Sequence, residues 1–408
     1  MSRQRMNKPD PQPKPRRSRF ARILLRAFLV FWVFVLLDGY LTHLPLQELG
    51  KRAPGEVVGI LHVHTRVSHD GGGTLEGVIQ AARNADLDFV TITEHNVPFD
   101  PWRLNKLPND VIVLPGEEVS TPNGHFVVLG VNPGWRDASP HPTEELLQRA
   151  GHAGGIRIIA HPFNGAPRWN YWNTAAFDGM EIWNDDAQWR RAGPALLVTA
   201  LMYPVNPELA LTRLATRPDP NLAKWDELLR TRHVVGTCGS DAHEAIILGG
   251  HLLAHFPKYV NIFRISRQHV LLSSAPEPGK PAPPSSDSIL DALRKGHTFC
   301  AVDSVASSSG FQEVVTSGAA TAGIGDTVPF DAKSLPKLRI VLPSAPSKPL
   351  IKVYKDGEVW VSSSDQTLEK EIAAPGVYRT EVWLRQPGLT GWNRWTPWII
   401  ANPIYVGR

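Results

Sequence analysis

The sequence predicts an α/β barrel of parallel strands, preceded by one membrane-spanning helix and followed by a small all-β domain. Three observations predict it. An apolar stretch near the N-terminus is long enough to cross a bilayer. Short apolar runs then alternate with helical stretches from residue 55 to residue 303. Beyond residue 304 the strand-like runs follow one another without helices between them.

The apolar stretch covers residues 23–42 and would rise about 30 Å as a helix. Residues 1–26 carry nine basic residues and one acidic residue, a net charge of +8. This flank predicts a signal anchor with residues 1–22 as a basic cytoplasmic tail and everything after residue 43 outside the cytoplasm, in the periplasm or extracellular space. Asp38 is then expected near the outer headgroups. A cleaved signal peptide is the alternative, but no small-x-small cleavage site follows the apolar run.

The charge of the rest of the chain limits its partners. The whole chain carries +4, so the part after residue 26 carries −4. A mildly acidic body is a poor surface for a nucleic-acid duplex, and we expect none to bind.

Cys238 and Cys300 are the only cysteines, which excludes a cysteine-based zinc cluster. Both lie in apolar, strand-like runs. We expect two buried free cysteines; a single bridge between them is the alternative.

The barrel is predicted from seven apolar runs, most of them too short for helices. Residues 75–85 place four apolar side chains on one helical face, and the helix ends at Asp86, which tolerates a left-handed conformation. Residues 186–232 predict a helical insertion interrupted by prolines. The active site of such a barrel lies at the carboxyl ends of its strands. The predicted strands are residues 57–61, 89–92, 111–114, 126–129, 156–160, 179–182 and 234–237.

Residues 43–54 are predicted to be a linker, and the Pro-rich residues 275–284 a surface loop. A helix from residue 287 or 288 to Lys295, stopped by Gly296, and one more strand follow that loop. The domain boundary is therefore placed between residues 303 and 304. Residues 304–408 predict a small sandwich-like domain with an Asp356-Gly357 hairpin. Its predicted strands are residues 338–342, 351–354, 359–361 and 377–383.

Nine residues of metal-ligand type fall at the ends of these runs. A lone histidine there is more often a satisfied core residue than a ligand. Their joint placement at one end of a barrel instead predicts a site for several divalent ions. The nine residues are His62, His64, Asp70, His95, Glu118, His125, His161, Asp241 and His243.

These residues lie in short motifs whose order along the chain resembles that of the PHP (polymerase and histidinol phosphatase) domain of metal-dependent phosphoesterases. The resemblance covers about residues 57–303. Residues 375–379 and 397–406 resemble the C-terminal domain of the carbaryl-hydrolase-like, membrane-associated branch of that superfamily. The motifs are His62-Val63-His64, Ser68-His69-Asp70-Gly71, Thr93-Glu94-His95-Asn96, Gly116-Glu117-Glu118, Ala160-His161-Pro162 and Ser240-Asp241-Ala242-His243.

The resemblance implies a distorted, TIM-like (β/α)7 barrel with two to three divalent ions, zinc, manganese or iron. One ion would take His62, His64, Glu118 and Asp241. A second would share Glu118 and add His125 and His161. A third would take Asp70, His95 and His243. Two departures bear on this set: Glu94 stands where the family commonly has Asp, and His69 is a rival ligand beside Asp70.

The expected reaction is hydrolysis of a small-molecule ester, most simply a phosphorylated one. A bridging water held by Glu118 would attack, with Asp241 and His243 in support. Glu94, Glu181 and Asn164 are candidates to orient ligands or substrate, with plain polar strand ends as the alternative. Arg168 is a candidate for a substrate anion, although a solvated arginine is favoured. The alternatives are hydrolysis of a carbamate or amide ester and, in a different class, a non-catalytic envelope-binding module.

Overall fold

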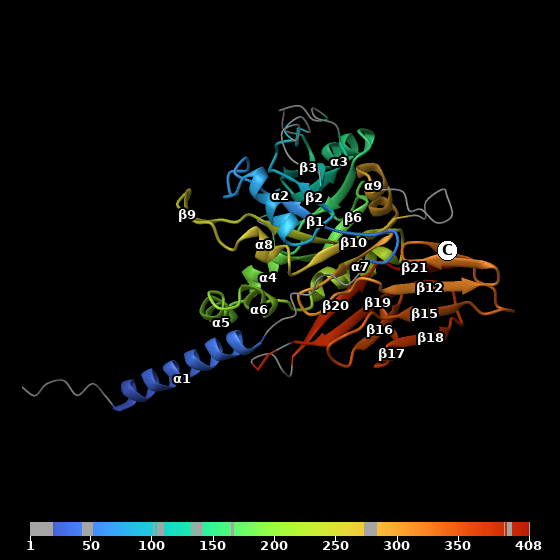
Figure 1. Cartoon of the computed structure of the whole chain (residues 1–408). Coiled ribbons are helices and arrows are strands. Elements are labelled where there is room, and N and C mark those ends of the chain that lie inside the picture. Colours follow the sequence, from blue (N-terminus) through green and yellow to red (C-terminus); the bar gives the residue numbers. More distant parts are fainter. Residues whose placement is uncertain are drawn as a thin grey trace, which may run out of the picture.

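The computed structural model describes residues 19–42, 52–100, 103, 110–131, 135, 141–164, 167–272, 284–386, 388–389 and 394–407. Residues 1–18 of the predicted tail, residues 43–51 of the predicted linker and residues 275–283 of the Pro-rich loop lie outside this part. A barrel and a lobe of C-terminal strands form the body, and one long helix projects from it (Figure 1).

All seven predicted barrel runs form strands, and the barrel closes because β7 pairs with β1. Neighbours in the chain are neighbours in the barrel from the first strand to the last. The strands are β1 (Glu56–Val63), β2 (Phe89–Ile92), β3 (Ile112–Thr121), β4 (Gly124–Leu129), β5 (Ile156–Ile159), β6 (Gly179–Asn184) and β7 (Val235–Ala242).

The prediction that all seven strands are parallel was wrong for β4. This strand runs antiparallel to both β3 and β5. The reason is the two-residue turn between Thr121 and Gly124, which is too short for the crossover connection that parallel strands need. Gly124 has a φ of +121°, and a Cβ there would lie 2.8 Å from the Trp169 backbone, so the turn depends on glycine.

The helices follow the predicted pattern closely. Helix α2 (Leu75–Asn84) buries Val78, Ile79 and Ala82, and Asp86 beyond its end has the left-handed φ of +55°. Helix α9 (Ser286–Lys295) ends at Gly296 with a φ of +75°, but begins earlier than predicted because Ser285 caps it. The remaining barrel helix is α3 (Thr143–His152).

The insertion before β7 is helical, as predicted, and is divided into four helices. These are α4 (Asp185–Arg191), α5 (Ala195–Met202), α6 (Pro207–Thr212) and α7 (Asp219–Leu229). After β7 the chain forms a hairpin of β8 (Ile246–Leu248) and β9 (His251–Ala254), then the short helix α8 (Tyr259–Ile262).

The C-terminal strands extend the barrel sheet. Strand β10 pairs with β1, β11 pairs with β10, and β20 pairs with β11, so hydrogen bonds cross the predicted boundary at residue 303. That boundary and the sandwich-like arrangement remain predictions. The extension contains β10 (Arg267–Leu271), β11 (Thr298–Ala301), β14 (Thr327–Val328), β16 (Leu350–Lys355), β17 (Glu358–Ser363), β19 (Gly376–Arg385), β20 (Trp395–Ala401) and β21 (Ile404–Val406).

A second, four-stranded sheet completes the lobe, in the order β13 (Ala320–Gly323), β12 (Gln312–Ser317), β15 (Lys337–Val341) and β18 (Thr367–Glu371). The predicted hairpin turn is present between β16 and β17, where Asp356 and Gly357 both have positive φ.

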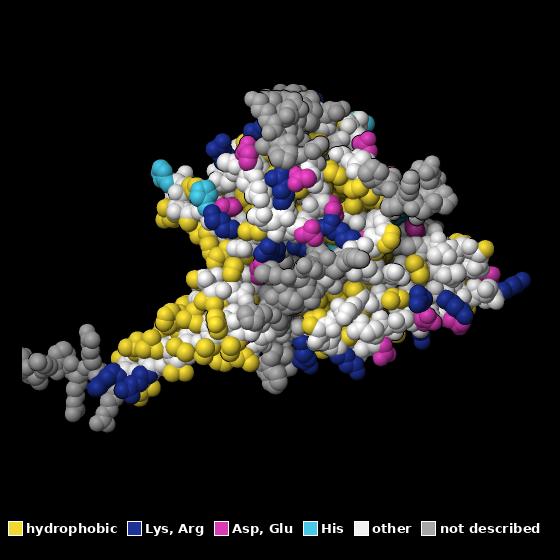
Figure 2. Space-filling model, in the orientation of Figure 1, with side chains coloured by type: hydrophobic (Ala, Val, Ile, Leu, Met, Phe, Trp, Pro, Cys, Tyr) yellow, Lys and Arg dark blue, Asp and Glu magenta, His cyan; other side chains and the backbone are white. Residues whose placement is uncertain are grey.

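Helix α1 (Arg19–Leu41) is long and apolar enough to cross a membrane, a test that a signal sequence also passes. Its hydrophobic side chains continue onto the adjoining face of the body (Figure 2). The Asp38 side chain is buried and paired with Arg213, and its expected position near the outer headgroups remains a prediction. The end of α1 packs on α5 and α6, where Val35 joins a small core with Met202 and Leu209.

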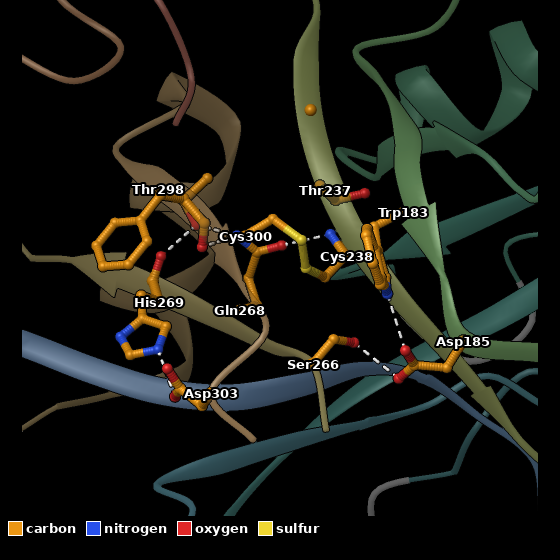
Figure 3. The surroundings of a disulfide bond; sticks show 12 residues. Trp183, Asp185, Thr237, Cys238, Ser266, Gln268, His269, Thr298, Cys300 and Asp303 are labelled. Atoms are coloured by element: carbon orange, nitrogen blue, oxygen red, sulfur yellow. Dashed lines mark hydrogen bonds and ion pairs between the residues drawn. A yellow bond between two sulfur atoms is a disulfide. The ribbon is translucent and has the colours of Figure 1, made fainter. Parts of the chain in front are cut away.

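The two cysteines form a disulfide, so the expectation of free cysteines was wrong and the alternative holds (Figure 3). Cys238 lies in β7 and Cys300 in β11, with their Cα atoms 5.4 Å apart. Gln268 of β10 lies beside them and accepts a hydrogen bond from the Cys238 amide at 2.8 Å. Strand β11 pairs with β10, which pairs with β1, the neighbour of β7. This arrangement depends on the whole sheet, so the separation of 62 residues in the chain did not indicate the contact.

Candidate metal centre

All nine predicted ligand residues lie together at one end of the barrel. Parallel strands deliver them from their carboxyl ends. His125 comes from the beginning of β4, and the antiparallel direction of that strand brings its first residues to the same end. The departure from a parallel barrel therefore completes the cluster.

In the part of the chain that the structure describes, three sets of side chains have ligand atoms within 4.8 Å of one another. The first set is fully buried and matches the first ion position that the family resemblance implies. The second contains the three residues implied for the third ion and adds His64. The sets are His62, His64, Glu118 and Asp241; His64, Asp70, His95 and His243; and His95, Glu118 and His125.

Glu118 stands at the centre of the cluster, and its two oxygens face different histidines. Oε1 lies 2.8 Å from His125 Nδ1 and 2.9 Å from His161 Nε2. Oε2 lies 3.0 Å from His62 Nε2 and 3.1 Å from His64 Nε2. A carboxylate placed in this way can offer one oxygen to each of two ions.

The distances fit ligands that surround an ion. His62 Nε2 and His64 Nε2 each lie 3.5 Å from Asp241 Oδ1. Ligand atoms about 2.1 Å from one ion are separated by about 3.0–3.4 Å at tetrahedral or octahedral angles.

The hydrogen bonding of the cluster also fits a metal. Within the described residues, His64 Nε2, Asp70 Oδ1 and His95 Nδ1 are buried without a hydrogen bond. A buried polar atom without a compensating partner costs about 1–3 kcal/mol. Glu118 Oε2 lies 3.1 Å from His64 Nε2 and 3.2 Å from His95 Nδ1 without hydrogen-bond geometry. A divalent ion would remove that cost, so the residues present fit the metals that the sequence predicts.

Two predicted ligands differ in detail. His161 contacts Glu118 Oε1, but the set that groups Glu118 with His125 contains His95, which lies 3.2 Å from Glu118 Oε2, and not His161. His69 is the rival ligand for the third position, and its ring lies 3.8 Å from Asp70 with 79% of its side chain exposed. Its exposure places it at the rim of the cluster. The assignment of individual ligands to ions remains a prediction.

Opposite charges compensate one another in this buried cluster. Burial works to raise the pKa of Glu118 and of Asp241, but the charge of His62 and hydrogen bonds from histidines lower both pKa values well below their usual range. Burial works to lower the pKa of His161 and His243, yet hydrogen bonds to carboxylates raise each pKa to about 9. The carboxylates are therefore ionised, which is the form that binds cations.

Glu181 of β6 contacts two histidines of the cluster, and its predicted role in orienting ligands remains a prediction. Its Oε1 lies 2.6 Å from His62 Nδ1, and its Oε2 accepts the His161 amide at 2.7 Å. An imidazole held at one nitrogen presents the other to a metal in a fixed orientation. A Cβ on Gly239 would lie 1.9 Å from Glu181 Oε1, so glycine is required for this approach. Sequence reasoning assigned no role to Asn184, which donates to Glu181 at 2.9 Å.

Glu94 orients a loop rather than a metal ligand directly. Its carboxylate accepts hydrogen bonds from the Thr65 amide at 3.0 Å and the Ser68 hydroxyl at 2.7 Å. Ser68 Oγ in turn lies 3.1 Å from His64 Nδ1. The longer side chain of Glu therefore reaches the loop that positions His64.

Asn164 lies at the cavity in front of the cluster, whereas Arg168 is solvent-exposed, the alternative that the sequence analysis favoured. Asn164 Oδ1 accepts from Arg191 at 2.6 Å. The basic residue that lines this cavity is Arg190 of α4, paired with Asp186. The sequence analysis did not identify Arg190 or Asp186, although their i, i+4 spacing on a short helix after β6 indicated an ion pair.

Backbone strain is concentrated at the cluster. His62, Asn96, His161 and Asp241 have φ values of +66°, +54°, +27° and +54°. Each such conformation costs on the order of 1–3 kcal/mol in a residue other than glycine. Strain of this kind persists where the surrounding structure fixes functional side chains.

No protein-family model matches the sequence, and no curated protein matches it. One similar solved structure, provisionally assigned as a metal-dependent phosphoesterase, is from Bifidobacterium adolescentis; it shows 15% identity over 45% of this chain and 87% of that chain, with a TM-score of 0.30. Another is an amidohydrolase from Chromobacterium violaceum with bound sulfate and no metal. It shows 16% identity over 49% of this chain and 92% of that chain, with a TM-score of 0.31. These TM-scores are too low to assign a function, and the PHP resemblance remains a prediction.

Proposed function

We propose that this chain is a metal-dependent hydrolase that acts on phosphate esters. The observation that carries the proposal is the position of Glu118, because Oε1 faces two imidazoles and Oε2 faces three. No thiol is available as a nucleophile, since both cysteines are in the disulfide. Divalent ions bound here would lower the pKa of a water and neutralise charge on the ester oxygens.

The chain's own residues would hold and orient the reacting groups. His62, His64, Glu118 and Asp241 would hold one ion, while Asp70, His95 and His243 would hold another. Glu181 fixes the orientation of His62 through its 2.6 Å contact. The cavity in front of the cluster has a volume of about 380 Å³, which suits a small ester group. Arg190 lies in its wall and offers a positive charge to a phosphate.

His243→Ala tests this proposal. The full chain would be assayed with added manganese or zinc against phosphomonoesters, phosphodiesters, carboxyl and carbamate esters and amides. Turnover of the preferred phosphoester should fall at least about a hundredfold, because a cation at a developing anion contributes several kcal/mol and about 1.4 kcal/mol is tenfold. Most of the metal at the first position should stay bound.

His152→Ala is the matched control, since His152 is an exposed histidine at the end of α3. It should leave turnover unchanged. Preference for a carbamate or amide would replace the phosphoesterase proposal with the second hydrolase class. A wild-type chain that binds metal but is inert on the whole panel would favour a binding module.

We also propose that α1 anchors the chain, with the body outside the cytoplasm. The charge of +8 before the helix supports this orientation, and the Cys238–Cys300 disulfide fits an oxidising compartment. Alkaline phosphatase fused after Arg408 should be active, and the mature chain should begin near Met1 in the membrane fraction. A soluble form beginning near residue 43 would instead identify a cleaved signal peptide.

A further inference from the structure

A second cavity adjoins the metal centre. Asp186, Asp241 and His243 line both this cavity and the one in front of the cluster. The second cavity is small, with a volume of about 110 Å³. A ligand that reaches Asp241 and His243 can therefore extend into a confined space.

The walls of the second cavity are apolar away from the metal centre. They are contributed by α4, the segment after α6, the hairpin strand β8 and the segment around α8. Trp183 is fully buried, and Leu211, Leu214 and Ala215 are nearly so. The apolar lining includes Trp183, Trp189, Leu211, Leu214, Ala215 and Phe256.

Asp185 and Gln188, two polar residues in these walls, are hydrogen-bonded to other protein groups. Asp185 accepts from Trp183 Nε1 at 2.8 Å and from Ser266 Oγ at 2.7 Å (Figure 3). Gln188 bonds to Thr216, with its Nε2 donating to the carbonyl at 3.0 Å. An apolar chain in the cavity would therefore leave no hydrogen-bonding group unsatisfied at these positions. The polar groups available to a ligand are Asp241 and His243 at the metal end.

The cavity wall continues into an apolar surface on the anchor side of the body. Ile246 lines the cavity and is 40% exposed in the β8–β9 hairpin, where Leu248 is 69% and Leu253 60% exposed. Leu197 of α5 is 51% exposed. The hairpin and α5 lie on the side from which α1 projects (Figures 1 and 2). Exposed apolar side chains beside a membrane anchor indicate contact with the bilayer surface.

We propose that the substrate is a single-chain amphiphile: a phosphate ester whose headgroup lies at Asp241 and His243 and whose alkyl chain occupies the second cavity. This proposal rests on the hydrolase function proposed above. In the reaction a water oxygen bonds to phosphorus, the ester P–O bond breaks, and the leaving oxygen takes a proton. The small volume of the cavity favours one alkyl chain, and the hairpin places the cavity within reach of lipid.

The test uses the full chain in lipid nanodiscs, loaded with manganese. The substrates are p-nitrophenyl phosphodiesters with methyl, butyl and octyl groups, each below its micelle concentration. Burial of each methylene should raise kcat/KM by up to about fourfold. The value of kcat/KM should therefore rise at least about tenfold from the butyl to the octyl substrate. Decylphosphonate should also raise the melting temperature more than methylphosphonate does, which measures binding without turnover.

Ala215→Phe should abolish the preference for octyl and keep methyl turnover, because it fills the cavity away from the metal ligands. Ile246→Gln is a second variant at a half-exposed position where folding is not at stake. Leu248→Gln is its matched control on the same hairpin, since Leu248 does not line the cavity. Loss of the chain-length preference in Ile246→Gln but not in Leu248→Gln would support the proposal.

The two proposals fail in different ways. Equal rates for methyl, butyl and octyl, with equal phosphonate stabilisation, would overturn the amphiphile and leave the hydrolase standing. Absence of turnover at every chain length, with decylphosphonate still stabilising the chain more than methylphosphonate, would overturn the phosphoesterase and support the apolar cavity as a chain-binding site. If Ile246→Gln and Leu248→Gln lose the chain-length preference to the same extent, the preference arises from membrane contact. That result would overturn the role of the cavity.

Discussion

Asp38 of α1 and Arg213, the residue that ends α6, form an ion pair with 3.2 Å between Oδ2 and Nη2, and both side chains are buried. The Leu389 amide donates to Asp38 Oδ1 at 2.6 Å, and Thr42 donates to the same oxygen at 2.8 Å. The apolar helix is therefore joined to the body by charged groups away from water. Removal of one partner would leave the other charged and buried.

Arg213→Met should lower the free energy of unfolding by about 3–5 kcal/mol, because it leaves the Asp38 carboxylate without its partner. The double variant Asp38→Leu/Arg213→Met should recover much of that loss, since no charge stays buried. Thermal and urea unfolding of the full chain in detergent would measure both. A double variant no more stable than the single one would show that the pair contributes through packing alone.

Glu118→Gln should lower bound metal by more than one equivalent, because the two oxygens of this carboxylate face different groups of histidines. The neutral amide also removes the charge that the imidazoles compensate. Metal content after dialysis would be measured by mass spectrometry on wild type and variant. Glu117→Gln is the matched control, since the neighbouring carboxylate accepts from Trp135 Nε1 at 2.9 Å instead. Full stoichiometry in Glu118→Gln would disprove the bridging role.

The sequence predicted the barrel well because its strands are short, apolar and separated by helical periods. The antiparallel β4 was missed because the turn between Thr121 and Gly124 was not interpreted as a hairpin. The site was predicted through residue types at strand ends, and all nine residues do converge. The sequence did not show that Asn184 and Arg190 approach the cluster, because their position depends on how the end of β6 and helix α4 pack beside the other strands.

Contacts between distant segments were the other gap. The Cys238–Cys300 bridge and the Asp38–Arg213 pair each join segments whose approach depends on the whole fold. Local patterns indicate which face of an element is buried, but they do not identify the partner that buries it. The second cavity shows the same limit, because its walls come from four separate stretches of the chain.

The disulfide should stabilise the body substantially. It closes a loop of 62 residues, for which the loss of chain entropy in the unfolded state corresponds to about 4 kcal/mol. The double variant Cys238→Ser/Cys300→Ser should therefore unfold at lower urea concentration than the oxidised wild type. Dithiothreitol should destabilise the wild type and leave the double variant unaffected. Reaction of two thiols per native chain with a thiol reagent would contradict the bridge.

Glu313 of β12 should make stability depend on pH. Burial raises its pKa to about 8, although the Thr380 hydroxyl donates to Oε1 at 2.8 Å and opposes this shift. The unfolded pKa is near the ordinary value of 4.5. Between these values the folded chain keeps a proton that the unfolded chain releases, so this contribution to stability is present below about pH 4.5 and is lost as pH rises to about 8.

Glu313→Gln should remove that loss, because an amide has no proton to release and can still accept from Thr380. The variant should match the wild type near pH 5 and exceed its free energy of unfolding at pH 9 by a few kcal/mol, since about 1.4 kcal/mol corresponds to one pH unit. Glu371→Gln, an exposed change in β18, is the control and should give a curve parallel to the wild type. Melting temperatures of the wild type and both variants, measured from pH 5 to pH 9, would test this expected pH dependence. If the Glu313→Gln curve is also parallel to the wild type, the buried carboxyl is already ionised in the folded chain.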